Sequence, residues 1–173
     1  VGNFLGSNAL AAVSSSSSLI FMLIGLFSGL SSGAGVIISR YFGAKNIDSM
    51  QRSIHTTVAA GLIAGIILTV IGVGLSPQIL VLMSTPPAVM TESVAYLQVY
   101  FAGSLGFVMY NVFVGILQAV GDSRHPLYYL IVSSIVNLVL DVVFIRNFHM
   151  GVDGAALATI ISQFISALLC LFQ

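Results

Sequence analysis

The chain has 173 residues, of which 58% are hydrophobic and only 6% are charged. A soluble domain carries about 25% charged residues, so this composition excludes a water-soluble globular protein and indicates one that lies in a membrane. Five Lys and Arg balance five Asp and Glu. This balance excludes the strongly basic surface that nucleic-acid binding requires, and the expected partner is the lipid bilayer.

Neither end of the sequence resembles the end of a complete protein. The chain begins VGNFLG, without an initiator Met or the charged region of a signal peptide. It ends LLCLFQ, inside an apolar run. We therefore expect these residues to be a fragment of a longer chain.

Five runs of the sequence are long and apolar enough to cross a bilayer as helices. A hydrocarbon core of about 30 Å requires roughly 20 helical residues. Backbone amides in lipid must be satisfied within their own segment, so the predicted fold is all-α, a polytopic bundle of five transmembrane helices. In chain order, the predicted spans are about 10–39, 54–76, 90–119, 126–146 and 153–173.

The charges in the connectors predict how the bundle is oriented. Successive connectors lie on alternate sides of the membrane, so Arg40, Lys45, Arg52 and Arg124 share one side. Arg146 is alone on the other side. Cytoplasmic connectors carry an excess of Lys and Arg, so the side with four cations is predicted to be cytoplasmic.

The first predicted span carries three glycines at a spacing of four, in the segment GLFSGLSSG. Gly25, Gly29 and Gly33 then share one helix face, where small residues allow another helix to come close. We expect this face to pack against a neighbouring helix.

The fourth and fifth predicted spans each carry one stripe of polar side chains. Ser133, Asn137 and Asp141 fall at i, i+4 and i+8 of the fourth span. The connector to the fifth span is short, so we expect the two helices to be antiparallel neighbours. Counting from their shared end pairs Asp141 with Thr159, and Asn137 with Gln163 one turn deeper. The stripe of the fifth span comprises Thr159, Gln163 and Ser166.

Asp141 is the leading functional candidate among these residues. A charge at the bilayer centre costs about 2.5 to 3.5 kcal/mol on insertion scales, and Asp is too short to reach the interface from there, so its presence favours a use. A polar cage around it would hold a small cation or a proton. The alternative is structural: Asp141 reaches interfacial water or pairs with Arg146, and the other polar groups bond within their helices. For Asn111, in the third span, a cavity contact and an interhelical hydrogen bond are equally compatible with the sequence.

The sequence contains no pattern typical of an enzyme. Its three histidines, His55, His125 and His149, show no metal-ligand spacing. HExxH, a phosphate-binding loop and a nucleophile elbow do not occur. We expect no enzymatic activity and no cofactor other than a coupling ion.

Several segments, in their order and spacing, resemble the multidrug and toxic compound extrusion (MATE) family of secondary transporters. LGSNALAAV and GLSSGAGVIISRYFGAKN lead into and out of the first span, and GILQAVGDSRHP joins the third to the fourth. NLVLDVVFI and GVDGAALATIISQ follow in the last two spans. The resemblance implies that the five spans correspond to helices two to six of the amino-terminal lobe of a twelve-helix, two-lobe transporter. The first helix and the second lobe of the same chain would then be missing partners.

The resemblance also implies roles for individual residues. Asn137 and Asp141 match the Asn and Asp of the family's fifth helix that take part in its cation or proton site, and Thr159 matches the sixth-helix Thr beside them. If Na+ is the coupling ion, these three residues are the candidates to hold it. Asn111 matches a polar position that faces the central cavity of family members. Two further candidates for cavity lining are Gln163 and Ser133.

The function implied by the resemblance is secondary active antiport in the cell (plasma or inner) membrane. The transporter would export small organic compounds, often cationic, in exchange for Na+ or H+ by alternating access. Two alternatives remain: a lipid-linked sugar flippase of the same superfamily, and a non-transporting membrane scaffold. A flippase is expected to place cationic side chains in its cavity, whereas all five Lys and Arg here lie in connectors or at span ends.

Overall fold

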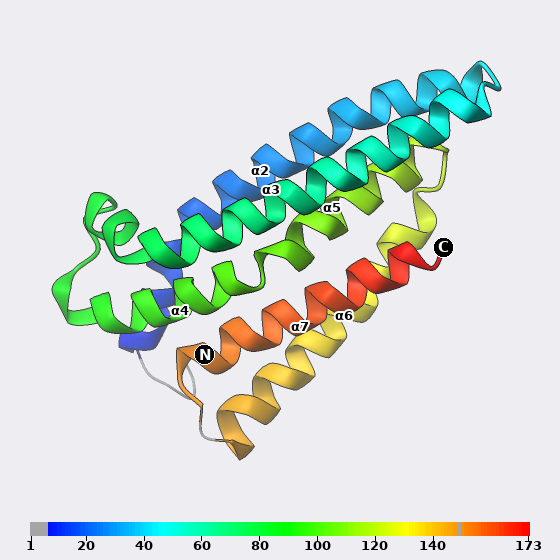
Figure 1. Cartoon of the computed structure of the whole chain (residues 1–173). Coiled ribbons are helices and arrows are strands. Elements are labelled where there is room, and N and C mark those ends of the chain that lie inside the picture. The colour runs from blue at the N-terminus through cyan, green and yellow to red at the C-terminus, as the bar shows by residue number, and fades with distance from the viewer. Residues whose placement is uncertain (1–6, 149) are drawn as a thin grey trace.

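The computed structural model describes residues 7–148 and 150–173, and the first two residues of the LGSNALAAV segment lie outside this range. The described part of the chain is all-helical, as predicted, and contains six α-helices (Figure 1). A short 3-10 helix and a π-helical turn accompany them. The bounds are α2 Ser7–Gly43, α3 Ile47–Leu82, η1 Pro87–Val89, α4 Met90–Ala102, α5 Ser104–Ala119, α6 Arg124–Val142, the π-helical turn η2 Val143–Asn147, and α7 Val152–Leu171.

The helices run up and down, so that their connections gather at two ends of the bundle. The α2–α3 turn, the α5–α6 connection and the end of α7 lie towards the right of Figure 1, and the α3–α4 and α6–α7 connections lie towards the left and below. We call the first of these the basic end. It carries four of the five Lys and Arg of the chain, namely Arg40, Lys45, Arg52 and Arg124.

Four of these helices are long and apolar enough to span a membrane, and the pair α4 and α5 makes a fifth span if it is counted as one bent segment. Large apolar side chains lie exposed along the outer helices, including Phe21 and Met22 on α2 and Ile63 on α3. In water such surfaces would be unfavourable, whereas in a bilayer they contact lipid chains. The span-like helices are Ser16–Gly43, Ile47–Leu82, Arg124–Asn147 and Val152–Leu171.

The predicted third span, 90–119, is bent rather than straight. Its two halves, α4 and α5, meet at Gly103 at an angle of 49°. A Cβ atom at Gly103 would overlap the side chain of Ile160 on α7. The bend therefore lies where the side chain of Ile160 on α7 comes close to the backbone of this segment, and glycine is the residue that leaves room for it.

Helix α3 continues beyond the predicted end of the second span, at residue 76, and runs through Pro77 to Leu82. Proline lacks an N–H, so the carbonyl of Val73 loses its intrahelical donor. The side-chain amide of Gln98 on α4 donates to that carbonyl at 3.4 Å. Because a neighbouring helix supplies the missing donor, the proline does not end the helix.

The glycine face of α2 does not pack as predicted. Apart from the neighbouring residues and backbone of α2 itself, no atom of the described residues lies within 4 Å of a Cβ built at Gly25, Gly29 or Gly33. Helix α2 instead makes its close contact at Gly115 of α5, where an added Cβ would lie 2.9 Å from the backbone oxygen of Ser31. The prediction of a close helix contact at the three glycines is therefore wrong within the described residues, because that face of α2 points away from the rest of the bundle.

Candidate functional site

A polar pocket lies between α6 and α7, where the two predicted stripes meet. Its volume is about 190 Å³. Helix α6 packs mainly against α7, so the polar face of α6 is turned towards this one neighbour. The pocket brings four predicted site residues together, Ser133, Asn137, Thr159 and Gln163, and its other lining residues are Tyr110, Leu130, Ser134, Ser162 and Ser166.

Hydrogen bonds between side chains and backbone join the two helices along this pocket. The hydroxyl of Ser133 donates to the carbonyl of Ser162 at 2.8 Å, and that of Ser166 donates to the carbonyl of Tyr129 at 3.1 Å. Each bond satisfies a serine that is buried among membrane-spanning segments. Polar groups in such places need partners, and these bonds hold α6 and α7 at a fixed register.

Asn137 and Thr159 form the bond that lies nearest to Asp141. The amide Nδ2 of Asn137 donates to Oγ1 of Thr159 at 3.3 Å, and this hydroxyl donates in turn to the carbonyl of Ala155 at 3.0 Å. The amide nitrogen of Asn137 is thus engaged, so its carbonyl oxygen is left to accept a hydrogen bond or to bind a cation. Oxygen ligands of this kind suit small, hard cations.

The observed register differs by one turn from the predicted one. The sequence count paired Asp141 with Thr159, but Thr159 lies opposite Asn137 instead. The count treated α6 as a regular helix up to Arg146. In the structure a π-helical turn, Val143–Asn147, ends this segment and α7 begins at Val152, so a count of regular turns from the connector does not hold.

Asp141 lies one turn beyond the Asn137–Thr159 bond and has an unusual environment. Its Oδ1 atom is buried and has no hydrogen-bond partner among the described residues. Among the residues that the structure describes, the carboxylate forms no ion pair with Arg146 or with any other cationic side chain. Tyr96 on α4 is close enough for an electrostatic interaction with it. A buried oxygen without a partner is rare in proteins and marks a place where water or an ion completes the site.

The remaining predicted site residues lie apart from this group. Gln163 lines the polar pocket and lies near the hydroxyl of Tyr100 on α4. The amide of Asn111 donates to the carbonyl of Phe107 within its own helix at 2.9 Å, and Asn111 does not line the α6–α7 pocket. This bond within its own helix is not the interhelical hydrogen bond that the sequence left open for Asn111, and the cavity contact stays a prediction.

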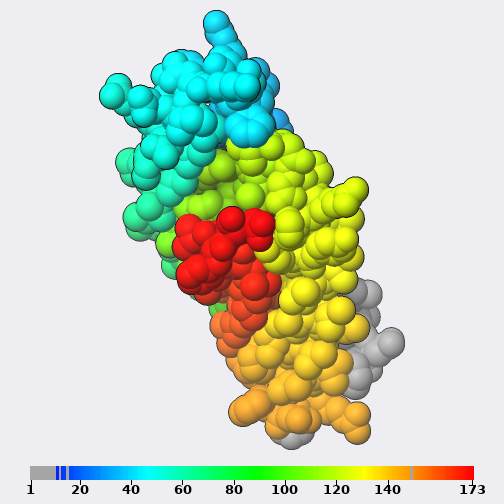
Figure 2. All heavy atoms as spheres, turned by 90° about the vertical axis from the view of Figure 1, so that its right-hand side faces the viewer, coloured from blue at the N-terminus to red at the C-terminus, as the bar shows by residue number. Residues whose placement is uncertain are grey.

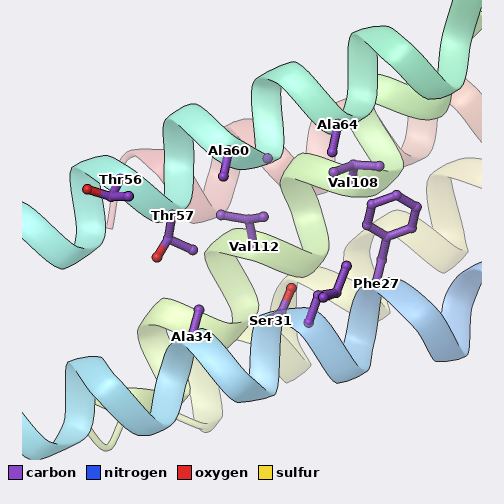
Figure 3. Close-up of a pocket in the computed structure, with 11 residues that line it drawn as sticks. Phe27, Ser31, Ala34, Thr56, Thr57, Ala60, Ala64, Val108 and Val112 are labelled. Atoms are coloured by element: carbon purple, nitrogen blue, oxygen red, sulfur yellow. The ribbon is translucent and has the colours of Figure 1, made fainter.

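A second, apolar pocket of about 300 Å³ lies between α2, α3 and α5, and sequence reasoning missed it (Figure 3). Phe27 and Ser31 project into it from α2, Thr57 from α3 and Val112 from α5. The feature of the sequence that could have predicted this pocket is a row of small residues along one face of α3. They include Thr57, Gly61 and Ala64, which leave space where larger side chains would fill it.

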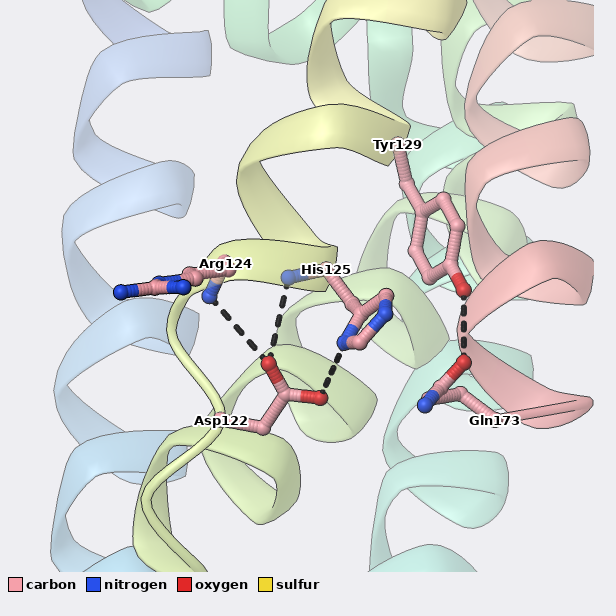
Figure 4. A network of polar contacts seen from close by, with 5 residues as sticks. All are labelled: Asp122, Arg124, His125, Tyr129 and Gln173. Carbon is pink, nitrogen blue, oxygen red and sulfur yellow. Dashed lines mark hydrogen bonds and ion pairs between the residues drawn. The ribbon is translucent and has the colours of Figure 1, made fainter.

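Sequence reasoning also missed a polar group at the basic end, which is formed by Asp122 and its neighbours. Oδ1 of Asp122 accepts the backbone N–H groups of Arg124 and His125, each at 3.2 Å, and Oδ2 lies 2.6 Å from Nδ1 of His125 (Figure 4). The backbone N–H of His125, together with its ring, holds the pKa of Asp122 below its usual value, although desolvation opposes this shift. The carboxylate therefore stays ionised, and caps the start of α6, until the pH falls below the ordinary range for Asp.

Comparison with known proteins connects these helices to one family. The model of the MatE family matches residues 1–143. A probable multidrug resistance protein, YoeA of Bacillus subtilis (strain 168), is 37% identical over 166 residues, which cover 94% of this chain and 36% of the relative. The chain thus spans little more than a third of the length of this curated relative.

Solved structures of MATE proteins contain the same arrangement of helices. A crystal structure of MATE in the bent conformation matches with a TM-score of 0.92 at 28% identity, over 96% of this chain and 37% of that one. An outward-facing structure and an inward-facing structure of a multidrug resistance MATE transporter, both 28% identical, match with TM-scores of 0.89 and 0.90. These cover 97% and 95% of this chain, and 37% and 38% of those chains. With a family model that spans most of its length and a fold shared throughout, this multi-pass membrane chain belongs to the MATE family of multidrug transporters.

Proposed function

We propose that these helices form part of a secondary active antiporter that exports small organic compounds, often cationic, in exchange for Na+ or H+. Asp141 would bind the coupling ion or proton, assisted by Asn137 and Thr159. The observation that carries this proposal is the buried Oδ1 of Asp141, which has no partner among the described residues although it lies in a segment able to span a membrane.

The physical argument concerns what happens when the charge of this carboxylate changes. An ionised carboxylate in apolar surroundings is costly, and binding a proton or Na+ neutralises it. Asp141 lies just before the π-helical turn η2, at the end of α6. Neutralisation therefore alters the preferred packing of this end of the helix, which is the differential interaction that ion coupling requires.

The fold comparison supports the view that these helices move together as one rigid body during alternating access. The chain matches an outward-facing and an inward-facing MATE transporter almost equally well, with TM-scores of 0.89 and 0.90. If the helices rearranged strongly between the two states, one match would be clearly poorer. We infer that this lobe moves as a unit against the rest of the transporter, with substrate held between them.

The test is efflux of a fluorescent organic cation from vesicles that hold the intact transporter, under imposed Na+ or H+ gradients. We expect Asp141→Asn to abolish gradient-driven efflux, because an amide keeps the shape of the carboxylate but cannot take up a proton or balance a cation. The gradient that drives efflux identifies the coupling ion.

Asp48→Asn is the matched control, because it makes the same change at the exposed first turn of α3. It should leave efflux unchanged. Efflux that survives Asp141→Asn would contradict the assignment of Asp141. A transporter that shows no efflux under either gradient would instead favour a flippase or a non-transporting scaffold.

A further inference from the structure

The polar stripe on α6 extends beyond the candidate coupling site and reaches the basic end. Five polar residues follow one another at intervals of four, namely His125, Tyr129, Ser133, Asn137 and Asp141. At about 1.5 Å per residue they cover roughly 24 Å, most of the thickness of the hydrocarbon core. An interval of four exceeds the helical repeat, so the stripe turns by about 40° at each step as it passes along the helix.

The three middle residues of this stripe, Tyr129, Ser133 and Asn137, each make a hydrogen bond to α7 or to the residues that follow it. The hydroxyl of Tyr129 donates to the side-chain oxygen of Gln173 at 3.0 Å (Figure 4). Ser133 and Asn137 bond to Ser162 and Thr159, as described above. In the space-filling view, the end of α7 (red) lies directly beside the first turns of α6 (yellow) at the basic end (Figure 2).

The pocket of about 190 Å³ occupies the middle of the stripe and is large enough for several water molecules. It runs from Leu130 to Asn137 along α6 and from Thr159 to Ser166 along α7. Its hydroxyls and amides can bond water, and one turn beyond it lies Oδ1 of Asp141, which has no hydrogen-bond partner among residues 7–148 and 150–173. At the other end of the stripe, Asp122 and His125 form a pair whose members can exchange a proton.

From this arrangement we propose that protons cross the membrane through water along the interface between α6 and α7. The Asp122–His125 pair is the point at the basic end where protons exchange with the aqueous phase, and we call this pair the port. A proton in the pocket passes along its water and then, by way of the Tyr129 hydroxyl, to the pair and the aqueous phase. The proposal rests on the antiport function above and adds to it the side and the route by which the proton leaves.

Other titratable groups surround the port. The rings of Tyr128 and Tyr129 on α6 lie with their centroids 6.4 and 6.1 Å from that of His125. Cys170 on α7 lies close enough to Asp122 for an electrostatic interaction. On α3, His55 lines a pocket with Cys170 and Gln173, and Arg124 points away from the pair in Figure 4. Of these groups, only His125 and Tyr129 lie on the stripe, and an imidazole exchanges protons near neutral pH whereas a phenol does not.

The path is tested by thiol labelling, which does not depend on transport. In the intact transporter with its native cysteines removed, including Cys170, single cysteines replace Ser133 and Ser166. Both lie in the pocket, one on each helix. The matched controls are Ile135→Cys and Leu168→Cys, at neighbouring positions that are 58% and 51% exposed on the bundle surface.

A charged, membrane-impermeant methanethiosulfonate is added from the basic side. Only a thiol in contact with water forms the reactive thiolate, so Ser133→Cys and Ser166→Cys should react about tenfold faster than the controls or more. Equal rates at all four positions, or reaction from the opposite side only, would overturn the path. Because labelling needs no efflux, this result is independent of whether the transport proposal holds.

The port is tested by the dependence of efflux on pH at the basic side. His125→Gln should flatten this dependence and leave substrate affinity unchanged, whereas His55→Gln should retain the profile of the unsubstituted transporter. If His125→Gln retains that profile as well, or if Na+ alone drives efflux, the Asp122–His125 pair is not the port.

Discussion

The absence of a Cβ atom at particular glycines allows these helices to approach one another closely. At Gly72 on α3, an added Cβ would overlap the ring of Phe101, whose side chain is only 2% exposed. Two residues further along the same helix, a Cβ at Gly74 would meet nothing within 4 Å. The two glycines look alike in the sequence, yet only Gly72 is required by packing, because only its face is turned towards α4.

We expect Gly72→Ala to destabilise the intact transporter by about 1 to 3 kcal/mol, as overpacking of a close contact does. Gly74→Ala should be neutral, or stabilising by up to about 1 kcal/mol, because alanine favours the helix. Thermal unfolding of the purified protein in detergent measures both changes. Phe101→Leu should recover part of the loss in the Gly72→Ala background. Equal effects of the two alanines would contradict the packing described here.

At the scale of a helix, the continuity of α3 depends on its neighbour. Pro77 removes the donor for the carbonyl of Val73, and Gln98 on α4 supplies another. Without water in the bilayer core, an unpaired carbonyl there is costly. The length of α3 is therefore a property of the α3–α4 pair.

Gln98→Leu should destabilise the transporter by about 1 kcal/mol, since it leaves the carbonyl of Val73 without a side-chain donor. The same change should cost little in a Pro77→Ala background, because residue 77 then donates its own N–H to that carbonyl. A double-mutant cycle on unfolding free energies measures this coupling. Additive effects of the two substitutions would show that Gln98 does not compensate for the proline.

At the scale of the whole molecule, the charge distribution predicts the orientation in the membrane. The basic end carries Arg40, Lys45, Arg52 and Arg124, and Arg146 is the only Lys or Arg near the other end. Short connectors rich in Lys and Arg stay in the cytoplasm. On this prediction the port proposed at Asp122 and His125 faces the cytoplasm, the side on which a proton-driven exporter would release its protons.

We expect a cysteine at Ala44, in the α2–α3 turn, to react with an impermeant thiol reagent only when the cytoplasmic face is accessible. A cysteine at Ala88, in η1, should react only from the opposite face. Both positions are exposed alanines at the two ends of the bundle, so the pair is matched in chemistry and accessibility. The reverse pattern, measured in oriented vesicles of the intact transporter, would invert the topology.

The sequence by itself determined the all-helical membrane fold, because apolar runs of about 20 residues have no other stable form in lipid. It also placed the polar residues of α6 on one stripe, since a regular helix dictates which side chains share a face. Only the tertiary structure decided the pairing of Asn137 with Thr159, the bend at Gly103 and the passage of α3 through Pro77. Each of these depends on contacts between helices, where a π-helical turn, an approaching side chain or a donor from a neighbour changes what local periodicity predicts. The same holds for Oδ1 of Asp141, which is buried by the packing around it and has no partner in the part of the chain that the structure describes.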